Sequence, residues 1–256
     1  ETDGGRFILG RQRVAWGSGR LWNPTDRFSP SSPTVFESGE KTGSDALMVE
    51  RYIGAFGALQ FVAAPGKHDR GVSRKIAARW RDTVGETDYA LLGGRIGGEP
   101  IVGLDLATNF LGGGLYFEST VGWPKDEARY VQSSTGYDTV WQPPFLVDTV
   151  TIGIEYFRNT AANGQKSAAL ATDRLQTRRQ HLFALSGGYD ISFLWRASGT
   201  LLLDTETASW ALVPSLLWSA AQDVDVQFLA QFYRGEIGSE YGTGQDALVV
   251  RISAYF

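Results

Sequence analysis

Apolar and polar residues alternate with a period of two over many short segments of the sequence. The clearest segment is VDVQFLAQFY (224–233), whose apolar face holds Val224, Val226, Phe228, Ala230 and Phe232. The stretch DALVVRISAYF (246–256) alternates in the same way. This period predicts strands with one apolar and one polar face. Helical periodicity is almost absent, so the pattern restricts the chain to an all-β fold.

Fourteen strands are predicted from this alternation, and the connections between them tend to alternate in length. The long connections include 17–44 and 158–178, and the tight ones include 54–57 and 111–114. No linker or change of composition divides the chain, so one domain is expected over residues 1–256. The strands are predicted near residues 5–16, 45–53, 57–64, 74–82, 88–96, 101–110, 114–123, 129–139, 147–157, 179–189, 194–204, 208–219, 224–234 and 246–256.

Tryptophans fall at the ends of the predicted strands. Trp16, Trp123 and Trp210 lie at the long-loop ends, whereas Trp141, Trp195 and Trp218 lie at the short-turn ends. A soluble core buries tryptophan near the middle of a strand, but a membrane barrel places it at both interfaces. We therefore expect an antiparallel transmembrane β-barrel of the bacterial outer membrane, with short periplasmic turns and longer extracellular loops. These six tryptophans and Phe256 are predicted to form its membrane girdles.

The alternative is a soluble β-sandwich or a small barrel with a dry interior, in which the apolar stripes point inward. Against it, the positions opposite the apolar stripes carry many charges, which predicts that they line a water-filled pore. Arg11, Arg13, Arg79 and Arg81 fall on early strands and favour a stripe that attracts anions. The other interpretation is that arginines and acids simply satisfy one another. The predicted pore-lining residues are Arg11, Arg13, Glu50, Arg79, Arg81, Arg95, Asp105, Glu118, Glu155, Arg196, Asp225 and Arg251.

The long connection 17–44 is the candidate constriction of this pore. It contains NPTD, in which Asn-Pro initiates a turn and Asp26 is expected to bond back to nearby backbone. Arg20, Asn23, Asp26 and Arg27 are its candidate functional residues. The segment is expected either to fold into the lumen and narrow it or to form a rigid extracellular loop.

Composition and motifs argue against other classes of function. The net charge of −4 gives no basic excess for nucleic acid, and a chain with no Cys and two His offers little for a metal site. GSEYG (238–242) has Glu240 where a nucleophile elbow has Ser, and GGRIGG (93–98) lacks the strand-turn-helix context of dinucleotide binding. We therefore expect neither an enzyme nor a cofactor.

Three segments resemble outer-membrane porin-like proteins, a broad group that includes alginate-export and related substrate-selective barrels. They are GRQRVAWGSGRLWNPTDRF (10–28), IEYFRN (154–159) and YRGEIGSEYG (233–242). The resemblance covers the two ends of the chain well and its middle loosely, and it identifies no substrate. It implies that the terminal Phe256 is recognised by the machinery that assembles such barrels.

The expected function is passive diffusion of small hydrophilic solutes, with anions or acidic sugars mildly favoured. The expected surroundings are the lipid bilayer and lipopolysaccharide. The alternative is a non-conducting barrel that serves as a scaffold or sheath for a partner protein. The first residues show no charged-then-apolar leader, so either a leader has been removed or the chain is part of a longer one.

Overall fold

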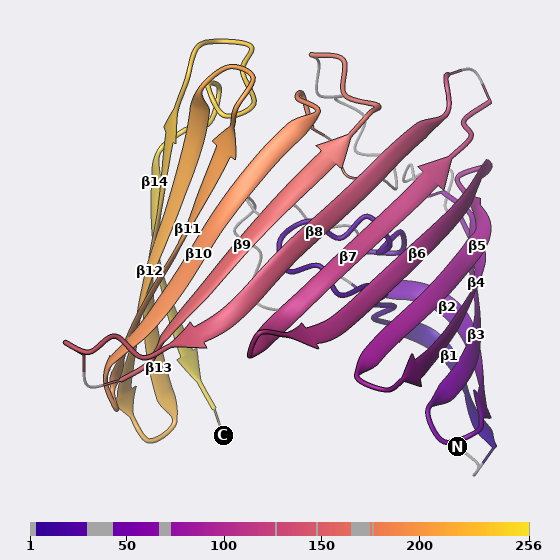
Figure 1. Ribbon diagram of the computed structural model, residues 1–256, viewed down its shortest axis with the longest axis horizontal. Coiled ribbons are helices and arrows are strands. Elements are labelled where there is room, and N and C mark those ends of the chain that lie inside the picture. The colour runs from indigo at the N-terminus through magenta and orange to yellow at the C-terminus, as the bar shows by residue number, and fades with distance from the viewer. Residues whose placement is uncertain are drawn as a thin grey trace. The chain divides into compact units, whose positions relative to one another are not determined.

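The computed structural model describes residues 4–29, 43–66, 73–125, 127–146, 148–164, 175 and 177–255. These residues form fourteen β-strands and no helix (Figure 1). The strands are β1 (Gly5–Gln12), β2 (Ser44–Ile53), β3 (Gly57–Ala64), β4 (Lys75–Val84), β5 (Thr87–Ile96), β6 (Glu99–Phe110), β7 (Gly113–Gly122), β8 (Tyr130–Trp141), β9 (Val150–Asn159), β10 (His181–Ser192), β11 (Trp195–Asp204), β12 (Ser209–Ala221), β13 (Val224–Arg234) and β14 (Ala247–Ala254).

The strands hydrogen-bond to their sequence neighbours in one sheet that runs in the order β1 to β14. The registered pairs are antiparallel, and the order is that of an up-and-down β-barrel. The prediction of an all-β, antiparallel fold with fourteen strands is therefore confirmed. Within the described part of the chain, no helix is long and apolar enough to cross a membrane.

Strand β1 ends at Gln12, earlier than the predicted end at residue 16. Val14 and Trp16 leave the sheet and become buried, and the Trp16 ring meets the Phe28 ring edge-on at 5.1 Å between centroids. The alternation of apolar residues continues past Gln12, but it now reflects packing of an irregular segment. Periodicity alone does not separate these two cases.

The chain divides into two compact units. Unit 1 comprises Glu1–Asn109, Leu115–Thr135 and Phe157–Gln180, and unit 2 comprises Phe110–Gly114, Gly136–Tyr156 and His181–Phe256. The prediction of a single domain stays a prediction. The two units are described separately below.

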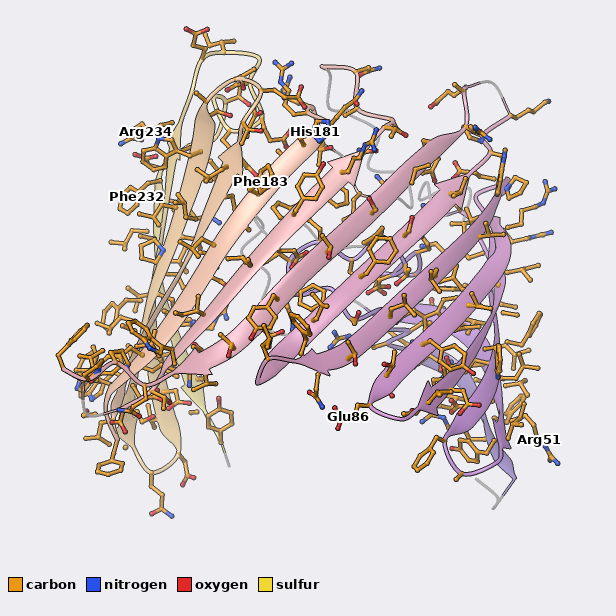
Figure 2. All side chains as sticks on the ribbon, in the orientation of Figure 1. Arg51, Glu86, His181, Phe183, Phe232 and Arg234 are labelled. Carbon is orange, nitrogen blue, oxygen red and sulfur yellow. The ribbon has the colours of Figure 1, made fainter. Side chains whose placement is uncertain are left out.

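Large side chains on one face of the unit 2 sheet, most of them apolar, align in rows across its strands. One row runs from Phe183 through Leu203 and Trp210 to Arg234, and the Tyr156 ring packs on Phe183 at 4.8 Å. The side chains of Phe232 and Arg234 extend to the same side of β13 (Figure 2). This row lies near the ends of the strands where β11 turns into β12.

A second aromatic row lies toward the other ends of the same strands. Trp195 pairs with Trp218, and their rings stack at 5.3 Å with an interplanar angle of 4°. Aliphatic residues fill the rows between, for example Ala197 opposite Leu216. On β11 the two rows pass through Trp195 and Leu203. The apolar band between and including the two rows therefore spans nine residues of this strand.

Candidate functional site

Charged side chains are buried on one face of the unit 1 sheet. This polar face of unit 1 carries the buried residues Glu50, Gln60, Lys75, Asp105 and Glu118, of which Glu118 is 0% exposed, and the partly exposed residues Arg79 and Arg81. The cross-strand pairing of Glu50 with Gln60 and of Gln60 with Arg79 places these residues on the same side of the sheet. A soluble protein usually buries its apolar residues and exposes its charges, so this arrangement is reversed.

The opposite face of unit 1 exposes large apolar side chains, each between 38% and 75% exposed. Register confirms that they share a face, since Leu59 pairs with Trp80 and Trp80 pairs with Leu91. The set is Phe7, Leu9, Val49, Leu59, Phe61, Ile76, Trp80, Leu91 and Val102.

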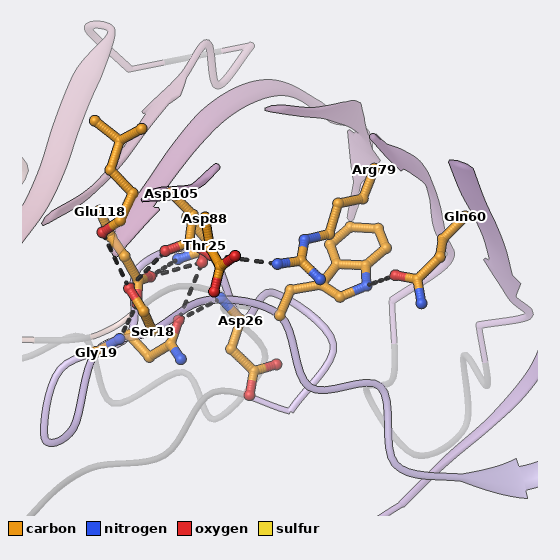
Figure 3. Close-up of polar contacts among 12 residues, drawn as sticks. Ser18, Gly19, Thr25, Asp26, Gln60, Arg79, Asp88, Asp105 and Glu118 are labelled. Atoms are coloured by element: carbon orange, nitrogen blue, oxygen red, sulfur yellow. Dashed lines mark hydrogen bonds and ion pairs between the residues drawn. The ribbon is translucent and has the colours of Figure 1, made fainter. Parts of the chain in front are cut away.

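Residues 13–29, here called the inserted segment, lie against the polar face of unit 1 (Figure 3). The Trp16 indole N–H donates to Gln60 Oε1 at 3.0 Å, and the Ser18 hydroxyl donates to Asp105 Oδ1 at 2.6 Å. Val14, Trp16 and Phe28 pack into an apolar cluster with residues of β2 to β6. The segment is thus held by both polar and apolar contacts.

Glu118, in the middle of β7, is the main polar anchor of the inserted segment. One carboxylate oxygen accepts from the Gly19 backbone N–H, and the other accepts from the Thr25 N–H at 3.2 Å and the Thr25 hydroxyl at 2.6 Å. A Cβ at Gly17, where φ is +96°, would overlap the side chains of Asn23 and Thr25. Glycine at this position therefore allows the segment to approach Glu118 closely.

The NPTD turn is closed by its own side chains. Asn23 Oδ1 accepts from the Asp26 N–H at 3.0 Å and lies 3.1 Å from the Thr25 hydroxyl oxygen. Asp26 Oδ1 accepts from the Ser29 N–H at 3.1 Å, which confirms the predicted bond from Asp26 back to nearby backbone. These bonds close the turn independently of its contacts with the sheet.

Arg27 fixes the far end of the inserted segment. Its guanidinium donates to the Tyr130 hydroxyl at 2.9 Å and pairs with Glu99 at 3.3 Å, and its side chain is 3% exposed. Tyr130 also donates to Glu99. The Lys75 ammonium donates to the carbonyls of Arg27 and Phe28, each at 3.0 Å. Arg20 is exposed, and its guanidinium lies 5.5 Å from the centroid of the Tyr116 ring.

A cavity of about 380 Å³ lies between Ser18 and strands β3 to β6. Arg79 and Arg81 are among the residues that line it. Both are paired: Arg79 Nη2 lies 3.2 Å from Asp105 Oδ2, and Arg81 Nη2 lies 3.4 Å from Glu50 Oε1. Each predicted arginine of this face therefore has a carboxylate partner, although Glu50 is shared between Arg81 and Arg6, whose Nε lies 2.6 Å from Glu50 Oε2.

Three of the predicted pore-lining arginines lie elsewhere, so the proposed stripe of four does not form. Arg11 pairs with Asp45 at 3.0 Å on the face of Leu9, and Arg13 is exposed in the segment after β1. Arg95 pairs in register with Ile76 on the apolar face. In these strands several apolar residues are consecutive, as in Phe7-Ile8-Leu9. Alternation therefore does not indicate on which face of the sheet each arginine lies.

In unit 2, Glu155 is 4% exposed, and the predicted charges of β11, β13 and β14 lie on the face opposite the aromatic rows. Arg196 pairs with Asp190 at 3.4 Å. Asp225 accepts from the Ser219 hydroxyl at 2.9 Å, and Arg251 donates to Gln227 at 3.4 Å.

Five of the predicted girdle tryptophans lie on accessible apolar surfaces. Trp195, Trp210 and Trp218 belong to the rows of unit 2, and Trp123 and Trp141 are exposed. The expectation for Trp16 is not met, because its ring is buried in the inserted segment and its N–H is satisfied by Gln60. Phe256 lies outside the described residues.

Sequence analysis missed several residues that hold the inserted segment. Gln60 could have been found, because it interrupts the apolar run of GALQFVAA at an alternating position. Lys75, Glu99 and Tyr130 lie at strand ends, where alternation carries no information. Thr25 lies inside the NPTD motif, but only its contact with Glu118 gives it a role.

The loop that contains GSEYG is a packed structural element of unit 2. Asp204 accepts from the Ser209 hydroxyl at 3.1 Å and from the Glu240 N–H at 3.3 Å, and the Tyr241 N–H donates to Ser209 Oγ at 3.3 Å. Burial raises the pKa of the Tyr241 phenol, which therefore stays protonated. In the described part of the chain, no three His, Asp or Glu side chains are grouped so that they could hold a metal ion.

Comparison of the chain with family models and with curated proteins finds no match to either.

Proposed function

We propose that the protein is an outer-membrane β-barrel that acts as a passive channel for small hydrophilic solutes, with the inserted segment narrowing its lumen. The observation that carries this proposal is the reversed distribution in unit 1, where charges are buried and large apolar side chains are exposed. A lipid environment around the apolar face and water along the polar face account for both.

The energetic scale supports lipid rather than water at the apolar face. Full transfer of a large apolar side chain out of water is worth about 2 kcal/mol. With roughly half the surface of each exposed, the set on unit 1 would forgo on the order of 10 kcal/mol in water. That is comparable to the whole stability of a typical domain, which is about 5–15 kcal/mol.

The apolar band of unit 2 has the length that a bilayer requires. Its aromatic rows bound nine residues of β11, from Trp195 to Leu203. A tilted strand crosses the hydrocarbon core with about 9–11 residues, and aromatic girdles flank that core. A soluble sandwich buries its apolar face against a second sheet, so it does not require two aromatic rows separated by the thickness of a bilayer.

Strong anion selectivity is not part of this proposal. Selection by charge needs an excess of one sign along the pore. The arginines of the polar face pair with Asp105 and Glu50, whereas Arg11 lies on the opposite face. The expected channel therefore discriminates weakly between cations and anions.

Single-channel recording tests this function. Detergent-purified protein would be added to a planar bilayer under a salt gradient. Discrete open steps with a reversal potential near zero are expected. If folded, heat-modifiable protein gives no conductance, the channel proposal fails and the non-conducting scaffold is favoured. A large reversal potential would show that the pore conducts but selects by charge.

A further inference from the structure

We propose that the cavity beside Ser18 is a binding site for a neutral, hydroxyl-rich solute such as a sugar or polyol. This inference rests on the proposed function, because it places the site on the path of the permeant. Its volume of about 380 Å³ is within the roughly 300–1,000 Å³ of small-molecule sites. The cavity lies entirely within unit 1.

Both donors and acceptors line this cavity. Arg79 and Arg81 supply planar guanidinium donors, Asp88 and Asp105 supply carboxylate acceptors, and Gln60 supplies an amide. Ser18 Oγ bridges from the inserted segment to Asp105. A sugar hydroxyl both donates and accepts, so adjacent hydroxyls match such a wall better than a group that only donates or only accepts.

The pairing of charges disfavours an ionic ligand. Arg79 is committed to Asp105 and Arg81 to Glu50, so an incoming anion would meet guanidinium groups that already have carboxylate partners. Asp82 and Asp88 also line the cavity and accept hydrogen bonds from Thr83, at 2.8 Å from its N–H and at 2.6 Å from its hydroxyl. With the two arginines and Asp105, the lining therefore holds charges of both signs in nearly equal number, which gives little net attraction to either kind of ion. A neutral ligand adds hydrogen bonds without breaking these pairs. The aromatic side chains of Phe56 and Tyr89 also line the cavity and offer surfaces for the C–H face of a sugar ring.

Arg81 is the side chain best placed to reach a ligand. Its side chain is 43% exposed, whereas that of Arg79 is 14% exposed. Its guanidinium fork holds two neighbouring hydroxyls with donors fixed in one plane, whereas the lysine ammonium carries its donors on one atom at the end of a flexible stem. The Arg81→Lys variant keeps the charge and loses the fork, so it separates hydrogen-bond recognition from electrostatic attraction.

Equilibrium binding to the folded protein tests the inference without requiring conduction. Glucose, glucuronate and glucosamine would each be titrated by calorimetry, in a detergent without a sugar head group. These ligands share one ring and differ in charge. Glucose is expected to bind, with an affinity that stays unchanged between about 50 and 500 mM NaCl, because salt screens ion pairs and leaves neutral hydrogen bonds largely unaffected. The charged analogues are expected to bind more weakly.

The variant and its control complete the test. Arg81→Lys should weaken glucose binding by about tenfold, the effect of losing one or two hydrogen bonds. Arg251→Lys, a matched change outside the cavity, should leave the affinity unchanged. Tighter, salt-sensitive binding of glucuronate would overturn the inference in favour of an anion site, and full glucose affinity in Arg81→Lys would overturn the recognition of hydroxyls by Arg81 in this cavity. The absence of glucose binding would also overturn it, while open channel steps in the bilayer would leave the channel proposal standing.

Discussion

Replacing Glu118 with glutamine should release the inserted segment from the sheet. The two carboxylate oxygens together accept from the Gly19 N–H, the Thr25 N–H and the Thr25 hydroxyl. In glutamine one of these oxygens becomes an NH₂ group, which cannot accept from an N–H. At least one buried donor then loses its acceptor, and the remaining bonds lose their charge assistance.

The size of this effect follows from those contacts. A hydrogen bond to a charged group contributes about 1.5–3 kcal/mol, and a buried donor left without an acceptor costs about 1–3 kcal/mol. We expect Glu118→Gln to weaken docking of the segment by about 3 kcal/mol, which raises the undocked population on the order of 100-fold.

Labelling of a single cysteine measures this population, because the chain contains no Cys. Val14 belongs to the inserted segment, is 2% exposed and packs in the apolar cluster, and cysteine is a small apolar replacement for it. In the Val14→Cys background, Glu118→Gln should accelerate modification by a water-soluble thiol reagent by about 100-fold when docking is in rapid equilibrium.

Glu155→Gln is the matched control, since it removes the charge of another buried glutamate, in unit 2. It should leave the labelling rate at Val14→Cys unchanged. Equal labelling rates in the Glu118→Gln and Glu155→Gln backgrounds would refute the role of Glu118 as the anchor. Heat-modifiability on a gel would show in each case that the strands remain folded.

Three further predictions follow from other contacts. Arg27→Met should lower the free energy of unfolding in detergent by about 3 kcal/mol, because it leaves the carboxylate of Glu99 without its charged partner. Arg27→Lys should recover part of this loss. Ala230 lies on the apolar face of β13, midway between the aromatic rows, and Ala230→Arg should destabilise the protein in vesicles by about 2–4 kcal/mol. The neighbouring Leu229→Arg, on the other face, should destabilise it much less. Equal destabilisation by the two variants would contradict the assignment of the apolar face to lipid. The backbone N–H of Tyr233 and then Arg234 lower the pKa of Asp246, so its stabilising contact is complete above the usual aspartate pKa and is lost as the pH falls through the lowered pKa. Protection of the Tyr233 amide, measured relative to the intrinsic exchange rate at each pH, should therefore fall only in acid, and Asp246→Asn should abolish that dependence.

The strands were predictable because one face of each meets a different environment from the other. VDVQFLAQFY reads as a strand since its apolar positions recur every second residue, and the structure has β13 at Val224–Arg234. The same logic fails where both faces are apolar. In β1, Phe7 and Leu9 are exposed while Ile8 packs against the core cluster, so the sequence did not indicate the face on which Arg11 lies.

The pairing of charges could not be predicted from alternation. Arg79 on β4 reaches Asp105 on β6, across the intervening strand β5. Such a contact depends on the register of three strands together, and an error of one residue in either register reverses the face. Alternation places Arg79, Arg81 and Asp105 on the face on which the register also has them, but their pairing with opposite charges appears only with the register. That is why an anion stripe was expected and paired charges are observed.

The inserted segment carried a signal that sequence analysis left unused. Trp16, Trp22 and Phe28 fall in or beside the long connection, and a loop in water gains nothing from exposing such side chains. In the structure all three are buried, and Trp22 stacks on Phe157 of β9 at 5.6 Å. Accessible polar contacts alone would exchange readily with water, so burial of these aromatic side chains helps to keep the segment docked. Aromatic residues within a long connection of a chain of alternating strands therefore indicate that the connection packs against the sheet, as residues 17–29 do.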